Sequence, residues 1–201
     1  MVKTLARRSA MLLLLILMTI VAACGGESDR SADSSGGASV PRSTVISETI
    51  FQGDLGGVVT VPGQGNIAAA VKDAAVPAIH LSSTGSKRDP VGDGNGGIFR
   101  LTPALSGMLN GRKVTVSISL RMAPQNGSPS VKAMYSRPGA ASSSGWHDLT
   151  AGPEFATASF EYKVPARAEE HGPDLVSIWA DPEAKGRGVE IQSIRIDSAA
   201  Q

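Results

Sequence analysis

The sequence predicts an all-β fold, an antiparallel β-sandwich, and three observations support that prediction. Short apolar segments alternate apolar and polar residues with a period of two, which is typical of half-buried strands. The 23 Gly and 12 Pro among 201 residues are too many for a helical bundle and show no collagen-like period. Turn residues separate the segments at intervals of about 8–12 residues, as in sandwiches and barrels.

The clearest predicted strand is Arg112–Met122, in which Val114, Val116, Ile118, Leu120 and Met122 share one face. The segment 189–197 changes its apolar parity between Ile191 and Ile194, which predicts a β-bulge there. Further strands are expected at 45–51, 57–61, 77–82, 98–101, 131–136, 155–164 and 174–181.

Only two segments have the composition of a helix. Thr102–Leu109 begins with a capping Thr and a Pro, which suits the first turn of a helix. Ile67–Ala75 is rich in alanine, but Pro77 follows it closely and leaves little room for a helix.

The N-terminus carries an export signal. Lys3, Arg7 and Arg8 precede the apolar run 11–23, which is shorter than the roughly 20 residues that span a bilayer and fits the core of a signal peptide. The run ends in Val-Ala-Ala followed by Cys24, and this resembles the lipobox of bacterial lipoproteins. The resemblance implies cleavage before Cys24, lipidation of its thiol, and a membrane anchor of two or three acyl chains.

The expected organisation is a signal peptide (1–23), a lipidated Cys24 with a flexible linker (24–44) and a β-sandwich domain (45–198). Residues 25–43 are mostly Gly, Ser, Asp and Ala, a composition that cannot form a packed core. The resemblance implies a protein exported to the cell envelope. Because Gly rather than Asp follows Cys24, it implies the periplasmic or surface side of the outer membrane if the source is Gram-negative.

Charge and cysteine content exclude several classes. Removing 1–23 takes away three of the 19 basic residues, which leaves 16 against 18 acidic ones and excludes a strongly basic nucleic-acid binder. Cys24 is the only cysteine, so the domain has no internal disulfide. His80, His147 and His171 are dispersed and form no zinc motif, and no Gly-x-Ser-x-Gly elbow is present.

From Leu101 onward, the order of segments resembles a known family. A short turn leads into the long strand ending near Arg121, then come a Lys-bearing strand (131–136), the segment 145–150, the strand 155–164, and a Gly-rich turn (185–188) before the last strand. This resembles the galactose-binding-domain-like jelly-rolls of carbohydrate-binding modules over roughly 97–198. The resemblance implies a two-sheet jelly-roll, a sugar site on a concave face or at loop tips, and often a structural calcium near the terminal strands.

Three residues are candidates for ligand binding. Trp146 begins a strand and could stack on a pyranose ring or pack against the rim of the core. Trp179 is an exposed platform if Val176 and Ile178 form the core face, and buried if Leu175 does. Arg121 ends an apolar strand on its polar side, where a guanidinium can bind hydroxyls or a carboxylate, or remain solvated.

The calcium implied by the resemblance has candidate ligands on the terminal strands. Glu48 and Asp197 would lie on the first and last strands, with Asp54 as a third carboxylate. An alternative oxygen cluster is Asp89, Asp93 and Asn95, although Gly-rich loops with Asp and Asn are also ordinary turns.

The sequence therefore predicts a non-catalytic, lipid-anchored envelope protein that binds carbohydrate or an envelope polysaccharide. The alternative is a structural or accessory lipoprotein that docks onto a secretion or polysaccharide-export complex. A third reading, an envelope glycoside hydrolase or lyase, would need convergent carboxylates or histidines in a cleft. The strand order favours the first, whereas the scarcity of aromatic residues (4%) favours the second.

Overall fold

The computed structural model describes residues 44–60, 65–71, 75–85, 96–138, 142–166 and 172–200. The expected signal peptide and residues 24–43 lie outside these ranges, as does the alternative oxygen cluster at Asp89, Asp93 and Asn95. The chain divides into two units, Met1–Val40 and the compact Pro41–Gln201, and all described elements belong to the second. Within the described ranges, no helix is long and apolar enough to cross a membrane.

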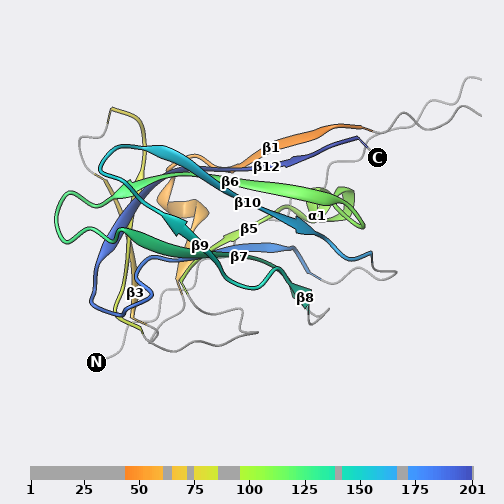
Figure 1. Ribbon diagram of the computed structural model, residues 1–201. Helices are drawn as coiled ribbons and strands as arrows, with labels where there is room; N and C mark the ends of the chain where they lie inside the picture. The colour runs from red at the N-terminus through yellow and green to blue at the C-terminus, as the bar shows by residue number, and fades with distance from the viewer. Residues whose placement is uncertain are drawn as a thin grey trace, which may run out of the picture. The chain divides into compact units, whose positions relative to one another are not determined.

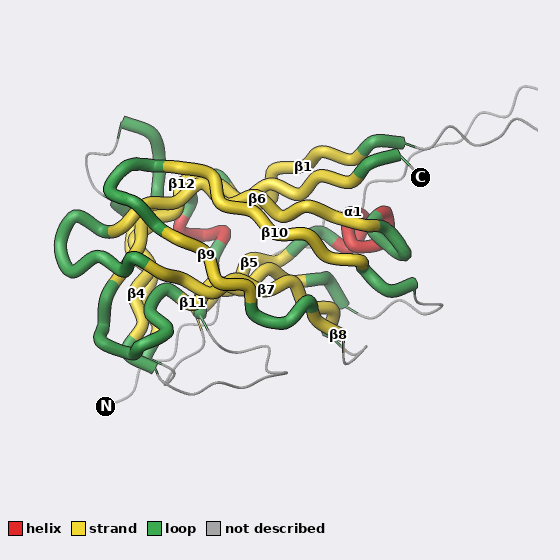
Figure 2. Tube along the Cα trace, viewed as in Figure 1, coloured by secondary structure: helices red, strands yellow, loops and turns green. Residues whose placement is uncertain are grey.

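Two antiparallel six-stranded sheets face each other, as the layers in Figures 1 and 2 show. Sheet A has the order β10-β6-β12-β4-β3, and β1 also pairs with β12. Sheet B has the order β2-β5-β11-β7-β8, and β9 also pairs with β7. The predicted all-β antiparallel sandwich is therefore confirmed.

The strands of sheet A are β1 (Ile46–Phe51), β3 (Asn66–Ala70), β4 (Ile79–Ser83), β6 (Lys113–Met122), β10 (Ala156–Lys163) and β12 (Gly188–Ser198). Those of sheet B are β2 (Val59–Thr60), β5 (Gly97–Arg100), β7 (Ser130–Arg137), β8 (Ser142–Ser143), β9 (His147–Thr150) and β11 (Leu175–Trp179). A 3-10 turn η1 (Leu55–Gly57) and one short helix α1 (Pro103–Met108) complete the described elements.

The core lies between the sheets and follows the period-two pattern. On β6, Val114, Val116, Ile118 and Leu120 are at most 2% exposed, whereas the residues between them are not buried. On β12, the pairing with β6 shifts between Ile191 and Ser193, so Ile191 and Ile194 both face the core. This confirms the predicted bulge: the extra residue returns the second apolar pair to the buried face.

The two helix candidates have different outcomes. The Thr102 side chain accepts a hydrogen bond from the Leu105 N–H and caps α1, as its sequence predicts. The first half of the alanine-rich segment, however, belongs to strand β3, and this is a correction of the helical alternative. Asn66–Ala70 pairs along β4, and Ala68 packs against the core, so tertiary pairing overrides the helical propensity of alanine.

A buried ion pair lies at the end of the sandwich where β7 ends and β11 begins. The side chains of Arg137 and Asp174 are fully buried, with Nη2 3.0 Å from Oδ2. Asp174 Oδ2 also accepts a hydrogen bond of 2.6 Å from the Tyr135 hydroxyl. Burial raises the pKa of Tyr135, and the Asp174 carboxylate raises it further, so the phenol stays protonated and donates.

The remaining Arg137 hydrogen bonds join other chain segments. Nη1 donates to Asn110 Oδ1 (2.8 Å) and to the Pro165 carbonyl (2.6 Å), and Nη2 donates to the Ser106 carbonyl (3.2 Å). One guanidinium thus connects β7, β11, helix α1 and the chain beyond β10. Because every partner is a hydrogen-bond acceptor held by the fold, the buried charge is fully compensated.

Replacing Arg137 with Met should lower the free energy of unfolding by roughly 3–5 kcal/mol, because the Asp174 carboxylate would stay buried without its cation. Chemical denaturation of the two proteins measures this difference. Lys113→Met, which removes an ion pair whose side chains are about 60% exposed (63% and 60%), is the control and should change stability little. Equal losses for the two variants would contradict the prediction.

Candidate functional site

A row of three ionisable side chains crosses the outer face of sheet A. His80 on β4 lies opposite Glu190 on β12, and Glu190 lies opposite Arg121 on β6. The preceding residue Leu120 and the following residue Ile191 belong to the core. Because successive side chains alternate across a strand, Arg121 and Glu190 point away from the core.

Glu190 is held by Arg121 but keeps one oxygen available. Both Nε and Nη2 of Arg121 lie 2.7 Å from Glu190 Oε2. Among the described residues, Oε1 has no hydrogen-bond partner, although Glu190 is only 5% exposed. The Arg121 guanidinium also lies 4.5 Å above the centre of the Phe155 ring, which fixes its plane. Glu190 is thus an oriented carboxylate with a free acceptor.

An open cleft lies over this row. Its volume is about 500 Å³, and the described residues that line it are His80, Ala123, Pro124, Gln125, Asn126, Gly186, Gly188 and Glu190. The lining offers an imidazole, two carboxamides and a carboxylate, which can both donate and accept hydrogen bonds. This set of groups suits a neutral ligand that carries several hydroxyl groups.

Gly188 fixes one wall of the cleft. Its carbonyl accepts hydrogen bonds from the N–H groups of Ala123 (3.1 Å) and Ser128 (2.8 Å), and its own N–H donates to the Asn126 carbonyl (3.0 Å). These bonds hold the loop 123–128 against the start of β12. A Cβ at Gly188 would collide with the His80 imidazole, so a larger residue here would displace that ring.

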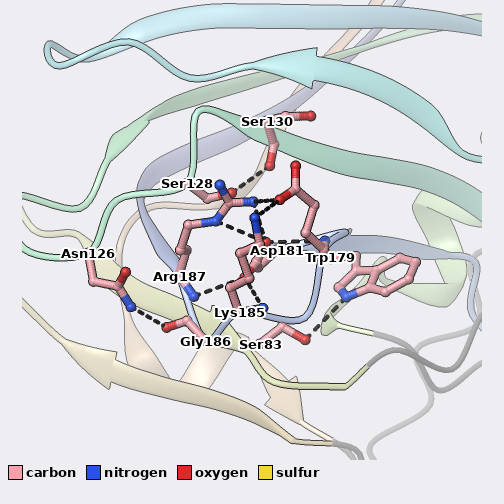
Figure 3. A network of polar contacts seen from close by, with 10 residues as sticks. Ser83, Asn126, Ser128, Ser130, Trp179, Asp181, Lys185, Gly186 and Arg187 are labelled. Atoms are coloured by element: carbon pink, nitrogen blue, oxygen red, sulfur yellow. Dashed lines mark hydrogen bonds and ion pairs between the residues drawn. The ribbon is translucent and has the colours of Figure 1, made fainter.

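The turn 181–187 forms the neighbouring wall and depends on Asp181 (Figure 3). The Asp181 carboxylate accepts hydrogen bonds from the backbone N–H groups of Glu183 (3.2 Å), Lys185 (2.6 Å) and Arg187 (3.0 Å). Nη2 of Arg187 lies 2.8 Å from Oδ1 of the same carboxylate. Figure 3 also shows the Asn126 amide donating to the Gly186 carbonyl (2.9 Å), which joins the turn to the loop 123–128.

These contacts determine the ionisation of Asp181. Its burial raises the pKa, but the hydrogen bonds from the Arg187 side chain and from three backbone N–H groups outweigh burial. The pKa of Asp181 is therefore lower than its ordinary value, and the carboxylate is charged at neutral pH.

The three predicted ligand-binding residues do not form one site. Arg121 lies on sheet A and reaches the cleft through Glu190, whereas Trp146 precedes β9 and Trp179 ends β11, both in sheet B. The two indoles pack edge to face, with ring centres 6.0 Å apart. Arg121 and the two tryptophans are therefore carried by different sheets.

Trp179 is buried, but not because Leu175 marks the core face, which was the condition that the sequence set for its burial. Val176 and Ile178 form the core face, as the exposed alternative requires, yet Trp179 is only 2% exposed. Its indole packs against Trp146 and donates a hydrogen bond of 3.2 Å to Ser83 Oγ. It is therefore not an exposed stacking platform.

The calcium ligands predicted on the terminal strands do not converge. β1 and β12 do pair, but Ser47 lies opposite Asp197, and Glu48 lies opposite Ile196. Because neighbouring residues point to opposite faces, Glu48 projects away from Asp197, which bonds to Ser47 and Arg195 instead. Asp54 caps η1. No group of three or more His, Cys, Asp or Glu side chains in the described ranges could hold a metal, so this pair does not fit calcium.

Sequence reasoning missed His80, Gln125, Asn126 and Glu190 as lining residues. The only local signal is the turn Gln125-Asn126-Gly127, where Asn126 has a positive φ of 51°. The cleft itself depends on contacts between segments about 60 residues apart, such as the one between Asn126 and Gly186. A pattern of neighbouring residues cannot predict a contact between segments that are so far apart in the sequence.

Comparison with known proteins supports the fold. No protein-family model matches the sequence, and no curated protein matches it. The CBM22-1 xylan-binding domain of Paenibacillus barcinonensis Xyn10C is similar in structure, with a TM-score of 0.50 and 10% identity over 80% of this chain and 97% of that domain. The CBM22-2 xylan-binding domain of the same protein has a TM-score of 0.51 and 12% identity over 77% of this chain and 99% of that domain.

The CBM22-1-CBM22-2 tandem of that protein gives a TM-score of 0.52 and 12% identity, covering 82% of this chain and 48% of the tandem. The chain has the jelly-roll fold of these modules. At such identities the likeness concerns the fold, and a fold of this kind hosts many functions.

The stabilisation that Asp181 provides should depend on pH. Because folding lowers its pKa, the charged carboxylate stabilises the folded state above the unfolded value of about 3.8, and this stabilisation is lost as the pH falls through the folded value. The difference in unfolding free energy between wild type and Asp181→Asn should therefore be largest near neutral pH and shrink in acid. Denaturation at several pH values tests this, and a difference that does not change with pH would contradict it.

Proposed function

We propose that this chain is a non-catalytic, lipid-anchored envelope protein that binds a glycan through its jelly-roll domain. The observation that carries the proposal is the open polar cleft on sheet A, on a sandwich whose structural neighbours include xylan-binding domains. The proposed site comprises His80, Gln125, Asn126 and Glu190.

The chemistry of the cleft supports a sugar ligand. Each hydroxyl of a sugar can donate and accept one hydrogen bond, and the lining presents the free Oε1 of Glu190, the carboxamide of Gln125 and the His80 imidazole. The volume of about 500 Å³ falls in the usual range for small-molecule sites, ~300–1,000 Å³. A short stretch of a glycan or its end fits such a space.

Binding in this cleft would rest on hydrogen bonds rather than on ring stacking. None of the described residues that line it is a Phe, Tyr or Trp. Of the eight aromatic residues in the chain, Trp146, Phe155 and Tyr162 are partly exposed and the others are buried. Without a stacking platform, the affinity for a glycan should be modest and should depend on the oriented polar groups.

The composition of the cleft supports a binding role rather than catalysis. Glycoside hydrolysis commonly uses two carboxyl groups on either side of the scissile bond. The described lining contains one carboxylate, Glu190, and Arg121 holds it through Oε2. Held in this way, the carboxylate is positioned to accept hydrogen bonds through Oε1.

The scarcity of exposed aromatic surface favours the second candidate function. A structural or accessory lipoprotein, docking onto a secretion or polysaccharide-export complex, needs no stacking platform. The burial of Trp179 at 2% exposure is the observation that favours this alternative. Recovery of a partner protein by cross-linking, together with no affinity for sugars, would support it.

The first glycans to test are soluble xylo-oligosaccharides, because two structural neighbours are named as xylan-binding domains. Calorimetric titration of residues 41–201, the compact unit that contains the described core, should show binding that Gln125→Ala weakens several-fold, because an exposed carboxamide in the cleft is lost. Trp146→Ala is the matched control on sheet B and should leave the affinity unchanged.

Two outcomes would contradict this assignment. Binding that survives Gln125→Ala and His80→Ala but is lost with Trp146→Ala would move the site to sheet B. The absence of binding to any member of a broad glycan array would contradict the glycan proposal itself.

The membrane anchor can be tested separately on the full chain. In a bacterial host that processes lipoproteins, metabolic labelling with an alkyne-bearing palmitate should mark the wild-type protein and place it in the membrane fraction. Cys24→Ser should abolish both signals, because the thiol is the acyl acceptor and Cys24 is the only cysteine. Membrane association that persists in Cys24→Ser would contradict lipid anchoring at this residue.

A further inference from the structure

Strand β3 lies at the edge of sheet A, and among the described residues no strand pairs with the other side of its backbone. It is the last strand in the order β10-β6-β12-β4-β3, and within the described residues it pairs with β4 alone. Ile67 is 60% exposed on this strand. An unpaired strand edge is a template for another extended strand.

The alternation of hydrogen bonds between β3 and β4 shows which backbone N–H and C=O groups of β3 point away from β4. Val71 N–H donates to the Ala78 carbonyl, and Thr84 N–H donates to the Gly65 carbonyl, so the residues at 65 and 71 form hydrogen-bonded pairs with β4. These pairs alternate along an antiparallel ladder. The backbone groups of Asn66, Ala68 and Ala70 therefore point away from β4, toward the open edge.

Within the described residues, this edge carries no charge, proline or bulge. Natural edges carry Lys or Pro, or are interrupted by a bulge, which prevents pairing with another chain. The sequence of β3 is Asn-Ile-Ala-Ala-Ala, without charge or Pro, and its pairing with β4 has no register shift. A second uncharged strand could therefore pair with β3 without charge repulsion or a steric clash from large side chains.

The edge is complementary to itself. The outward residues Asn66, Ala68 and Ala70 are spaced symmetrically about Ala68. A two-fold axis at Ala68 would place Asn66 of one copy opposite Ala70 of the other, and Ala68 opposite Ala68. Each of these three pairs would exchange two N–H···O=C bonds, so every outward group would find a partner.

We propose that β3 forms the interface of a two-fold symmetric dimer, in which the β3 strands of two copies pair antiparallel about Ala68. The two A sheets then form one continuous sheet. The interface is small, so the dimer dissociates readily in solution, and attachment of both copies to one membrane would raise their effective concentration. This proposal does not rest on the glycan site: the cleft residues Gln125, Asn126 and Glu190 lie on other elements, although His80 lies on β4 opposite Ala69.

The test is sedimentation of residues 41–201 across a wide range of concentration, with each variant first shown to be folded by circular dichroism and melting temperature. Wild type should convert from monomer to dimer as concentration rises. Ala70→Pro should remain monomeric, because it removes an outward N–H while leaving the pairs that bond to β4. Met108→Lys, which alters an apolar side chain 49% exposed on α1, is the control and should dimerise as wild type does.

Two charge substitutions test the strand register of the proposed dimer without introducing a proline. In the proposed dimer, position 67 of one copy lies opposite position 69 of the other. Ile67→Lys and Ala69→Asp should each weaken dimerisation when present alone. A mixture of these two variants should form heterodimers more readily than either forms a homodimer, because the introduced ammonium and carboxylate groups then lie opposite each other.

Three results would overturn the proposal: a wild type that remains monomeric at every concentration, a dimer that Ala70→Pro leaves intact, or no preference for heterodimers in the mixture. Capture of an extended strand from another protein by a monomeric wild type would likewise exclude a second copy as the occupant. Glycan binding is measured separately on the wild type, because Ala69 lies opposite the cleft residue His80.

Discussion

The buried ion pair between Arg137 and Asp174 determines how one end of the sandwich closes. The Arg137 guanidinium, carried by β7, binds Asp174 just before β11, groups in and directly after helix α1, and the segment after β10, so it joins these parts of the chain. A buried ion pair adds little net stability compared with a well-packed apolar group, but a broken one is costly. The network therefore penalises alternative packings of these segments.

A second carboxylate, that of Asp181, organises the turn 181–187 through hydrogen bonds and an ion pair. Asp181 accepts hydrogen bonds from three backbone N–H groups and from Arg187, so a single carboxylate organises the turn 181–187. The cleft is lined by Gly186 of that turn, by residues 123–126, by Gly188, and by His80 and Glu190. Arg121 acts on it by holding Glu190. The proposed ligand site thus depends on oriented polar groups rather than on exposed aromatic rings.

The alternation of residues predicted most of the fold because it reports burial directly. Val114, Val116, Ile118 and Leu120 face the core as expected, and the change of parity between Ile191 and Ile194 located a bulge. Composition was a poorer guide for Ile67–Ala75, where alanine favours a helix in isolation but pairing with β4 makes a strand. Trp179 shows the same limit, because its neighbours Trp146 and Ser83 come from distant segments.

By itself the sequence determined the fold class, which face of the main strands is buried, and the resemblance of residues 1–26 to a lipoprotein signal. Each of these depends on residues that are close together in the sequence. The tertiary structure alone decided which polar residues meet. It placed Arg121 beside Glu190 on one sheet and the two tryptophans on the other, and it directed Glu48 away from Asp197. The physical reason is that strand register and loop contacts join residues tens of positions apart, and a one-residue change in register moves a side chain to the opposite face.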